Sequence, residues 1–173
     1  MTTQTASLAL APADLGTRLI AVVIDGLVLG LVYLVLITII AVGAVVQGDI
    51  NIVAAASRSV LWALLSAAYF AYGWTKWKAS PGQRVMGLRT VKADDGQALS
   101  GMQALTRWAY LFGPSAFASL FTQPEQVGGF VSFVIQLLVL VYYVYLYRTA
   151  SADPRRQGFH DKQVGSIVVK VAA

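Results

Sequence analysis

The sequence contains no cysteine among its 173 residues. Disulfides, thiolate catalysis and cysteine-ligated metal sites are therefore excluded. Charged residues are also scarce, because Asp, Glu, Lys and Arg make up only 12% of the chain, about half of the roughly 25% typical of soluble domains. Hydrophobic residues make up 57%. This imbalance excludes an ordinary soluble domain and indicates a polytopic membrane protein in contact with the lipid bilayer.

The sequence also lacks the motifs that mark common catalytic and nucleotide-binding sites. It has no P-loop, no zinc-ligand spacing, no dinucleotide-binding fingerprint and no paired glutamates. We therefore expect a protein that is not an enzyme, with no catalytic residue, no metal site and no cofactor. The net charge of +5 comes without a basic helix or an aromatic-spaced RNA motif, so we expect no nucleic-acid partner.

What the sequence does contain is four long apolar stretches; three are near the roughly 20 residues that a helix needs to cross a membrane, and the first is longer. They cover about residues 19–46, 59–76, 105–122 and 129–147. The third is the weakest, because Arg107 opens it and we expect Gly113-Pro114 to break it. The first is too long for a signal-peptide core and follows a start without basic residues, so we expect a permanent anchor.

Lysine and arginine residues predict which side of the membrane each connection faces. One basic group lies between the second and third stretches, and another follows the fourth. The first group is Lys76, Lys78, Arg84, Arg89 and Lys92, and the second is Arg148, Arg155, Arg156, Lys162 and Lys170. By the positive-inside rule both groups face the cytoplasm. An even number of crossings must lie between them, so the third stretch also crosses.

These observations predict an all-α membrane protein with four transmembrane helices and both termini in the cytoplasm. We expect residues 14–170 to form a single membrane domain and residues 1–13 to form an N-terminal cytoplasmic tail. The outer connections, at about 47–57 and 123–128, are too short to hold a folded domain.

The segments on the cytoplasmic side carry local structure of their own. Ser80–Gln83 has the pattern of a helix start, with a serine cap and a proline in the first position. Leu88–Lys92 alternates like a strand, and Asp94–Gly96 reads as a turn. Ser166–Val171 is β-branched and also strand-like. Because a lone strand leaves its backbone groups unpaired, we expect these two strands to pair into a small cytoplasmic β element.

The first apolar stretch contains two opposite charges, Arg18 and Asp25. A charge at membrane depth costs about 2.5–3.5 kcal/mol on insertion scales. The two residues are close to two helical turns apart and share one helix face, about 10 Å apart along the axis. Arg18 can extend to the headgroups, but Asp25 is too short and must be protonated, paired with a cation or facing water. A structural interhelical hydrogen bond and a proton or ion site both remain open for it.

Several neighbouring residues are candidates for supporting roles. Gly26 and Gly30 follow the carboxylate with the small-xxx-small spacing that lets helices pack closely, so we expect a helix contact there. Arg107 is either an interface anchor or an ion-pair partner for that carboxylate or for an acid in the tail. His160 precedes Asp161 in the polar tail, and without a suitable serine or cysteine this pair does not indicate catalysis.

Several of these motifs occur together in one known family. Arg18 and Asp25 in the first helix, residues 80–91 after the second, and His160-Asp161 before a terminal strand resemble the RDD family of integral membrane proteins. That family is named for one arginine and two aspartates. The resemblance extends over nearly the whole chain, about residues 14–170.

Carried over to this sequence, the resemblance makes Arg18, Asp25 and Asp161 the arginine and the two aspartates of the family. Gln83 stands where the family has a basic residue. The resemblance implies a multi-pass protein of the bacterial plasma (inner) membrane with a part in transport, and a few members of the family are linked to sodium/proton antiport.

Two functions fit these observations. The first is transport of a small solute or ion, cation- or proton-coupled, with Asp25 as the responsive group; four helices are few for a transporter, so we expect a homo-oligomer. The second is a non-catalytic accessory or assembly subunit of a larger complex of membrane proteins. In this second interpretation Arg18, Asp25 and Asp161 form an internal lock, and the tail acid pairs with Arg18 or Arg107.

Overall fold

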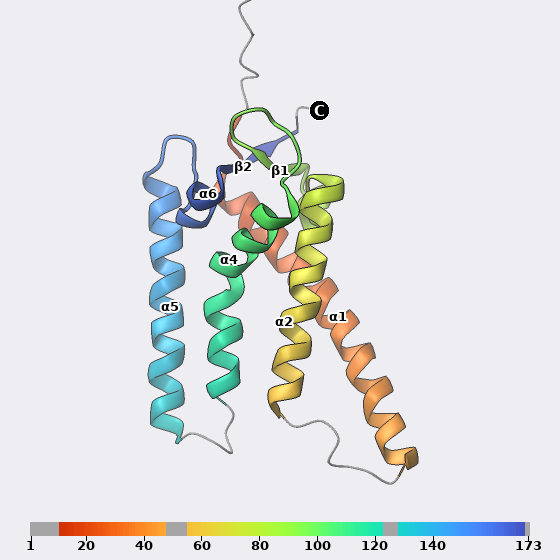
Figure 1. Ribbon diagram of the computed structural model, residues 1–173. Coiled ribbons are helices and arrows are strands. Elements are labelled where there is room, and N and C mark those ends of the chain that lie inside the picture. Colours follow the sequence, from red (N-terminus) through yellow and green to blue (C-terminus); the bar gives the residue numbers. More distant parts are fainter. Residues whose placement is uncertain (1–10, 48–54, 123–127, 172–173) are drawn as a thin grey trace, which may run out of the picture.

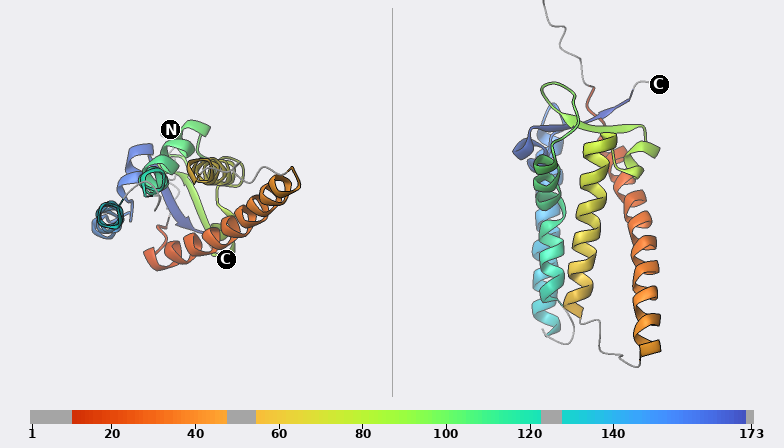
Figure 2. Two further views of the ribbon diagram at one scale, coloured as in Figure 1. Left: turned by 90° about the horizontal axis from the view of Figure 1, so that it is seen from below. Right: turned by 45° about the vertical axis from the view of Figure 1, so that its right-hand side comes forward.

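A computed structural model describes residues 11–47, 55–122 and 128–171 of the chain. Four long helices run alongside one another, with the far half of the first leaning away from the rest (Figures 1 and 2). They are α1 (Leu15–Gln47), α2 (Ala55–Tyr72), α4 (Gly101–Phe121) and α5 (Gly129–Ala152). The short elements gather at one end of the bundle (Figure 1). They are the π-helical turn η1 (Gly73–Trp77), the helices α3 (Pro81–Val85) and α6 (Phe159–Val164), and the strands β1 (Leu88–Lys92) and β2 (Ser166–Lys170).

Two of the described helices, α1 and α5, are long and apolar enough to cross a membrane. The mean hydropathy is 2.8 over Leu15–Gly43 and 2.1 over Gly129–Ala152. Their large apolar side chains are mostly exposed rather than packed inside the protein; Leu27 is 71% exposed and Phe130 is 78% exposed. An apolar surface of this extent suits contact with lipid chains. The protein is thus mostly helical, with two candidate membrane-spanning helices and a small two-stranded sheet.

Helix α4 is continuous through Pro114, so the break predicted at Gly113-Pro114 is wrong. It also begins earlier than expected, because Ser100 caps its first turn. Proline has no N–H to donate to the carbonyl four residues earlier, which belongs to Tyr110. The hydroxyl of Tyr142 in α5 donates to that carbonyl instead. A hydrogen bond between helices therefore replaces the one that proline removes.

The two predicted strands do pair. β1 and β2 form an antiparallel sheet whose register places Leu88 opposite Lys170. Pro12 forms a further bridge to Val169, and Ala13 beside it is only 1% exposed. The last residues of the expected N-terminal tail therefore belong to the fold, because the edge of β2 offers them backbone partners. We call η1, α3, β1, α6 and β2, together with Pro12 and Ala13, the cap.

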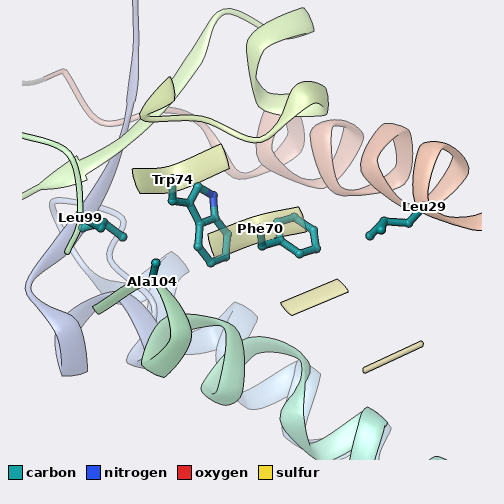
Figure 3. Packing of buried hydrophobic residues seen from close by; sticks show 5 residues of the cluster. All are labelled: Leu29, Phe70, Trp74, Leu99 and Ala104. Atoms are coloured by element: carbon teal, nitrogen blue, oxygen red, sulfur yellow. The ribbon is translucent and has the colours of Figure 1, made fainter. Parts of the chain in front are cut away.

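The main apolar core lies where α2 packs against α4, just beneath the cap. Figure 3 shows its five buried members, which come from α1, α2, η1, α4 and the segment before α4. They are Leu29, Phe70, Trp74, Leu99 and Ala104. The ring of Phe70 also stacks on Phe112 of α4, with centroids 4.7 Å apart. This packing fixes Trp74 of η1 at the inner side of the cap, where its ring borders Arg107.

Gly26 and Gly30 do not make the close helix contact that their spacing predicted. A Cβ atom built on either glycine would meet no described atom within 4 Å, beyond its own helix backbone. Aromatic side chains hold α1 away from α2 instead, since Tyr33 packs edge-on against Trp62 with ring centroids 5.1 Å apart. A cavity of about 110 Å³, lined in part by Gly26, occupies the space that remains. The close helix contact predicted from the spacing of Gly26 and Gly30 is therefore wrong, because α2 presents the large side chain of Trp62 to α1.

Candidate functional site

Asp161 lies fully buried at the centre of a charged cluster beneath the sheet. It is in the first turn of α6, where its Oδ2 accepts a hydrogen bond from the N–H of Gly158 at 3.2 Å. Arg107 of α4 donates to its Oδ1 from Nε at 3.0 Å and from Nη2 at 2.7 Å. The hydroxyl of Ser166 donates to the same oxygen at 3.1 Å. Arg18 completes the cluster, with its Nη1 3.5 Å from Oδ2.

The cations around Asp161 decide its charge. Burial by itself would raise the pKa of the carboxyl, but the two arginines, Arg107 and Arg18, hold it at about 2. The group is therefore an anion at neutral pH. A buried ion pair adds little stability over apolar packing, yet removing one partner costs about 3–5 kcal/mol because a charge is left uncompensated. The cluster thus fixes where α1, α4 and α6 sit relative to one another.

Arg18 joins the start of α1 to the C-terminal part of the chain. Its Nη1 donates to the carbonyl of Arg156 at 2.7 Å, and its Nη2 donates to the carbonyl of Val168 at 3.0 Å. The sequence suggested a headgroup anchor for this residue, whereas its hydrogen bonds are to the protein backbone.

Arg107 has a second contact besides its hydrogen bonds to Asp161. Its guanidinium lies over the ring of Trp74, at 4.4 Å from the ring centroid.

His160 borders this cluster without carrying a charge at neutral pH. Its Nε2 is 3.4 Å from Oδ2 of Asp161. Burial lowers the pKa of the imidazole to about 4, although the neighbouring carboxylate acts in the opposite direction. The ring is therefore neutral, and the carboxylate is balanced by the two arginines.

Asp25 is the other buried acid of the sequence prediction, and it has a separate environment. It is 1% exposed and accepts hydrogen bonds from the Tyr69 hydroxyl at 2.7 Å, the Ser80 hydroxyl at 2.5 Å and the Gly82 N–H at 2.7 Å. A Cβ at position 82 would lie 2.2 Å from the carbonyl oxygen of Ala21, so only glycine lets α3 approach this closely. Asp25 therefore holds α3 and α2 against α1.

Asp25 makes no ion pair within the described part of the chain, so the structure separates it from Arg18. The predicted set of Arg18, Asp25 and Asp161 is replaced by a cluster of Arg18, Arg107 and Asp161, with Asp25 apart from it. Arg107 was predicted to be either an interface anchor or an ion-pair partner, and it pairs with the tail acid Asp161. Asp25 accepts hydrogen bonds from residues outside its own helix.

Gln83 at the start of α3 acts as a neutral acceptor. Its Oε1 accepts hydrogen bonds from Nε1 of Trp74, the backbone N–H of Ser80 and the hydroxyl of Thr90, each at 3.0 Å. Tyr69 and Trp74 were not predicted as site residues, because aromatic residues in an apolar helix usually indicate packing. The one available signal was the buried carboxylate itself, which needs donors from neighbouring helices.

A cavity of about 160 Å³ connects the two acidic environments. Its lining includes Arg18, Asp25, Arg107 and His160. The rest of the lining is largely apolar and comes mainly from α1, α4 and α5. Within the described residues no group of three or more histidines and acids is placed to hold a metal ion.

The chain as a whole matches one known protein family. A family model described as the RDD family matches residues 12–165. The chain belongs to the RDD family. This RDD chain has no match among the curated proteins and none among the solved structures that were compared. Family membership agrees with the apolar, exposed surfaces of α1 and α5 in indicating a membrane protein.

Proposed function

We propose that this RDD protein is a multi-pass protein of the bacterial plasma membrane that moves a small solute or ion across the bilayer. The observation that carries the proposal is the cavity beneath the cap, whose lining includes Arg18, Asp25 and Arg107. Charged groups at membrane depth are costly, and in membrane proteins they mark pathways for ions and solutes. The cavity would be the site that the solute occupies between the two sides.

The proposal includes four crossings with both termini in the cytoplasm. Helices α2 and α4 have 18 and 21 residues. At about 1.5 Å per residue they reach about 27 and 32 Å, close to the roughly 30 Å hydrocarbon core. The two ends of the described chain also meet, since the N–H of Lys170 donates to the carbonyl of Ala11 at 3.2 Å. An even number of crossings is the simplest arrangement that leaves both ends together.

Asp25 is the group that we expect to respond to the transported ion or proton. Its three donors come from α2 and from the start of α3 rather than from its own helix. A shift of α3 would withdraw two of these donors and leave the carboxylate facing the cavity. With about 30 Å³ per water molecule, the cavity of about 160 Å³ has room for about five. A proton or a partly hydrated cation could then replace the withdrawn donors.

Reconstitution into liposomes tests this proposal. A sodium or potassium gradient is imposed, and the internal pH is followed with a trapped dye. We expect wild type to produce an ion-driven pH change and Asp25→Asn to lose most of it. Asp95→Asn is the matched control, because this exposed turn residue undergoes the same chemical change far from the cavity. Equal rates for wild type, Asp25→Asn and empty vesicles would rule out ion-coupled transport.

A second candidate, an accessory or assembly subunit of a larger membrane complex, is favoured by the rigidity of the cap. Asp161 ties α6 to Arg107 in α4 and to Arg18 in α1, which gives a fixed platform at one end of the bundle. Affinity purification in mild detergent separates the two candidates. An accessory subunit would copurify with a stoichiometric partner, whereas a protein that migrates alone or only with copies of itself would argue against that role.

A further inference from the structure

Three buried nitrogen atoms around the cavity have no hydrogen-bond partner within the described residues. They are Nε of Arg18, Nη1 of Arg107 and Nδ1 of His160, and all three residues line the same cavity. Buried polar groups are nearly always paired, and each unpaired one deserves a physical explanation. Arginine nitrogens only donate hydrogen bonds. The missing partner of the two guanidinium groups is therefore an acceptor.

The two buried acids beside the cavity are already engaged by other donors. Both oxygens of Asp161 accept hydrogen bonds, from Arg107, Ser166 and Gly158. Asp25 accepts its own set of three. One face of the Arg107 guanidinium is covered by the Trp74 ring, and its Nε and Nη2 donate to Asp161, so Nη1 is the nitrogen left for a further contact. Within the described residues nothing supplies an acceptor for the unpaired donors, which leaves them available to a bound molecule.

The size and the walls of the cavity limit what that acceptor can be. Its volume of about 160 Å³ is below the roughly 300–1,000 Å³ of sites that enclose a drug-sized molecule. Only a group of a few heavy atoms fits among the charged residues. The walls toward α1 and α5 include Leu19 and Tyr147, which are 65% and 60% exposed. The cavity therefore borders the apolar outer surface of the two helices that are long enough to span a membrane.

We propose that this cavity binds an anionic oxygen group, a carboxylate or a phosphate, that accepts hydrogen bonds from Arg18 Nε and Arg107 Nη1. Guanidinium groups bind both of these anions through directed, charge-assisted hydrogen bonds. The anion is either the headgroup of an amphiphile whose chain lies along α1 and α5, or a free small anion. The identification of this anion as the transported substrate rests on the proposed function, because it assigns a substrate class to the same cavity.

Thermal unfolding of the full-length protein in a neutral detergent tests the proposal with matched probes. Laurate and phosphatidic acid supply the anionic group on an apolar chain, acetate and inorganic phosphate supply it alone, and dodecanol supplies the chain without the charge. At about 100 times the Kd, a bound probe should raise Tm by about 5–10 °C. A rise with the amphiphiles alone assigns the site to a lipid headgroup, and a rise with acetate or phosphate assigns it to a free anion. An equal rise with dodecanol, or no rise with any anion, overturns the proposal.

A pair of variants on α1 locates the binding. Val22 lines the cavity and Val23 does not; both are partly exposed. Val22→Trp should fill the space and abolish the rise in Tm, whereas Val23→Trp should retain it. A full response in Val22→Trp would contradict binding in this cavity. If Val22→Trp fails to fold, the smaller Val22→Met variant should weaken the response in the same direction.

The outcomes for binding and for transport can be told apart. Anion binding without an ion-driven pH change in liposomes would leave the anion site in place and rule out ion-coupled transport. A pH change that depends on Asp25, without stabilisation by any anionic probe, would support ion-coupled transport and overturn the anion site.

Discussion

Asp161 and Asp25 are both buried carboxylates, yet the protein compensates their charges in different ways. Asp161 faces two guanidinium groups, whereas Asp25 is held by two hydroxyl groups and one backbone N–H. Ion pairs gain strength at the low dielectric of a buried site, and within the described residues only Asp161 of these two acids has them. Asp161 is thus the more firmly held of the two, and Asp25 is the one whose partners can be exchanged at lower cost.

His160 gives the folded state a dependence on pH that can be measured. Burial lowers the pKa of its imidazole from 6.5 to about 4, so the unfolded chain takes up a proton first as the pH falls. The contribution of neutral His160 to the free energy of unfolding is fully present above about pH 6.5 and is lost as the pH falls toward 4. A shift of this size corresponds to about 3 kcal/mol. Thermal unfolding of wild type in neutral detergent should therefore show Tm falling over this range.

The matched control is His160→Gln, which keeps a nitrogen near the Nε2 position but does not titrate. Its Tm should stay nearly constant between about pH 6.5 and 4. The pKa of Asp161 is about 2, so its contribution is lost only at lower pH and does not interfere. A wild type whose Tm is as constant as that of the variant would contradict the prediction.

Among the elements, α3 is short but is fixed closely against α1. The contact depends on Gly82, where a Cβ would lie 2.2 Å from the carbonyl oxygen of Ala21 and 2.8 Å from Cγ of Asp25. Gly82→Ala should therefore push α3 away and lower the free energy of unfolding by about 4 kcal/mol or more, which is the range of severe packing defects. Gly26→Ala, on the face of α1 where a Cβ meets nothing, should raise it by about 0.5–1 kcal/mol.

Chemical unfolding of both variants in detergent measures this difference. The comparison also tests the two glycine environments directly, because the small-xxx-small spacing predicts the opposite order, with Gly26→Ala the damaging change. Equal stabilities for the two variants would show that α3 does not sit against α1 in the arrangement described.

Helices α4 and α5 are coupled through the proline in α4. The Tyr142 hydroxyl donates to the Tyr110 carbonyl that Pro114 leaves unpaired. Tyr142→Phe should cost about 1–3 kcal/mol, because the partly buried carbonyl loses its donor. In a Pro114→Ala background the same change should cost much less, since the backbone N–H at position 114 can then donate. A double-mutant cycle of unfolding free energies measures this coupling.

Tyr143→Phe serves as the control for that cycle. Its hydroxyl donates to the Ser115 hydroxyl and not to the Tyr110 carbonyl. The cost of Tyr143→Phe should be the same in the wild-type and Pro114→Ala backgrounds. If Tyr142→Phe also cost the same in both backgrounds, the exchange of partners would be excluded.

Elements with a local signature were predictable from the sequence, and those that depend on distant contacts were not. The alternation in Leu88–Lys92 and the Ser80 cap located β1 and α3 correctly, because strand and cap patterns are written in neighbouring residues. The continuity of α4 was missed, since it depends on Tyr142 from another helix. The pairing of Arg107 with Asp161 was one of several alternatives. The donors to Asp25 could not be found, because nothing local connects them to it.

At the scale of the whole molecule, the proposed four crossings predict opposite accessibility for the two ends of the bundle. The chain has no cysteine, so single cysteines can be introduced at Arg89 in β1 and at Gly129 at the start of α5, both of which are exposed. A membrane-impermeant thiol reagent applied to intact cells should label Gly129→Cys. It should label Arg89→Cys only after the membrane is opened. Labelling of both positions from the same side would mean that α4 does not cross.

The construction of the cap from both ends of the chain has a consequence for biosynthesis. Arg18 donates to the carbonyls of Arg156 and Val168, which are separated from it by 138 and 150 positions. At a synthesis rate of about 5–20 residues per second, these partners emerge about 7–30 s after the arginine. The first helix therefore enters the membrane before its arginine has any of its final backbone contacts. Closure of the cap cannot begin until β2 has been synthesised, and nascent chains that stop short of β2 would insert their helices and leave the cap open.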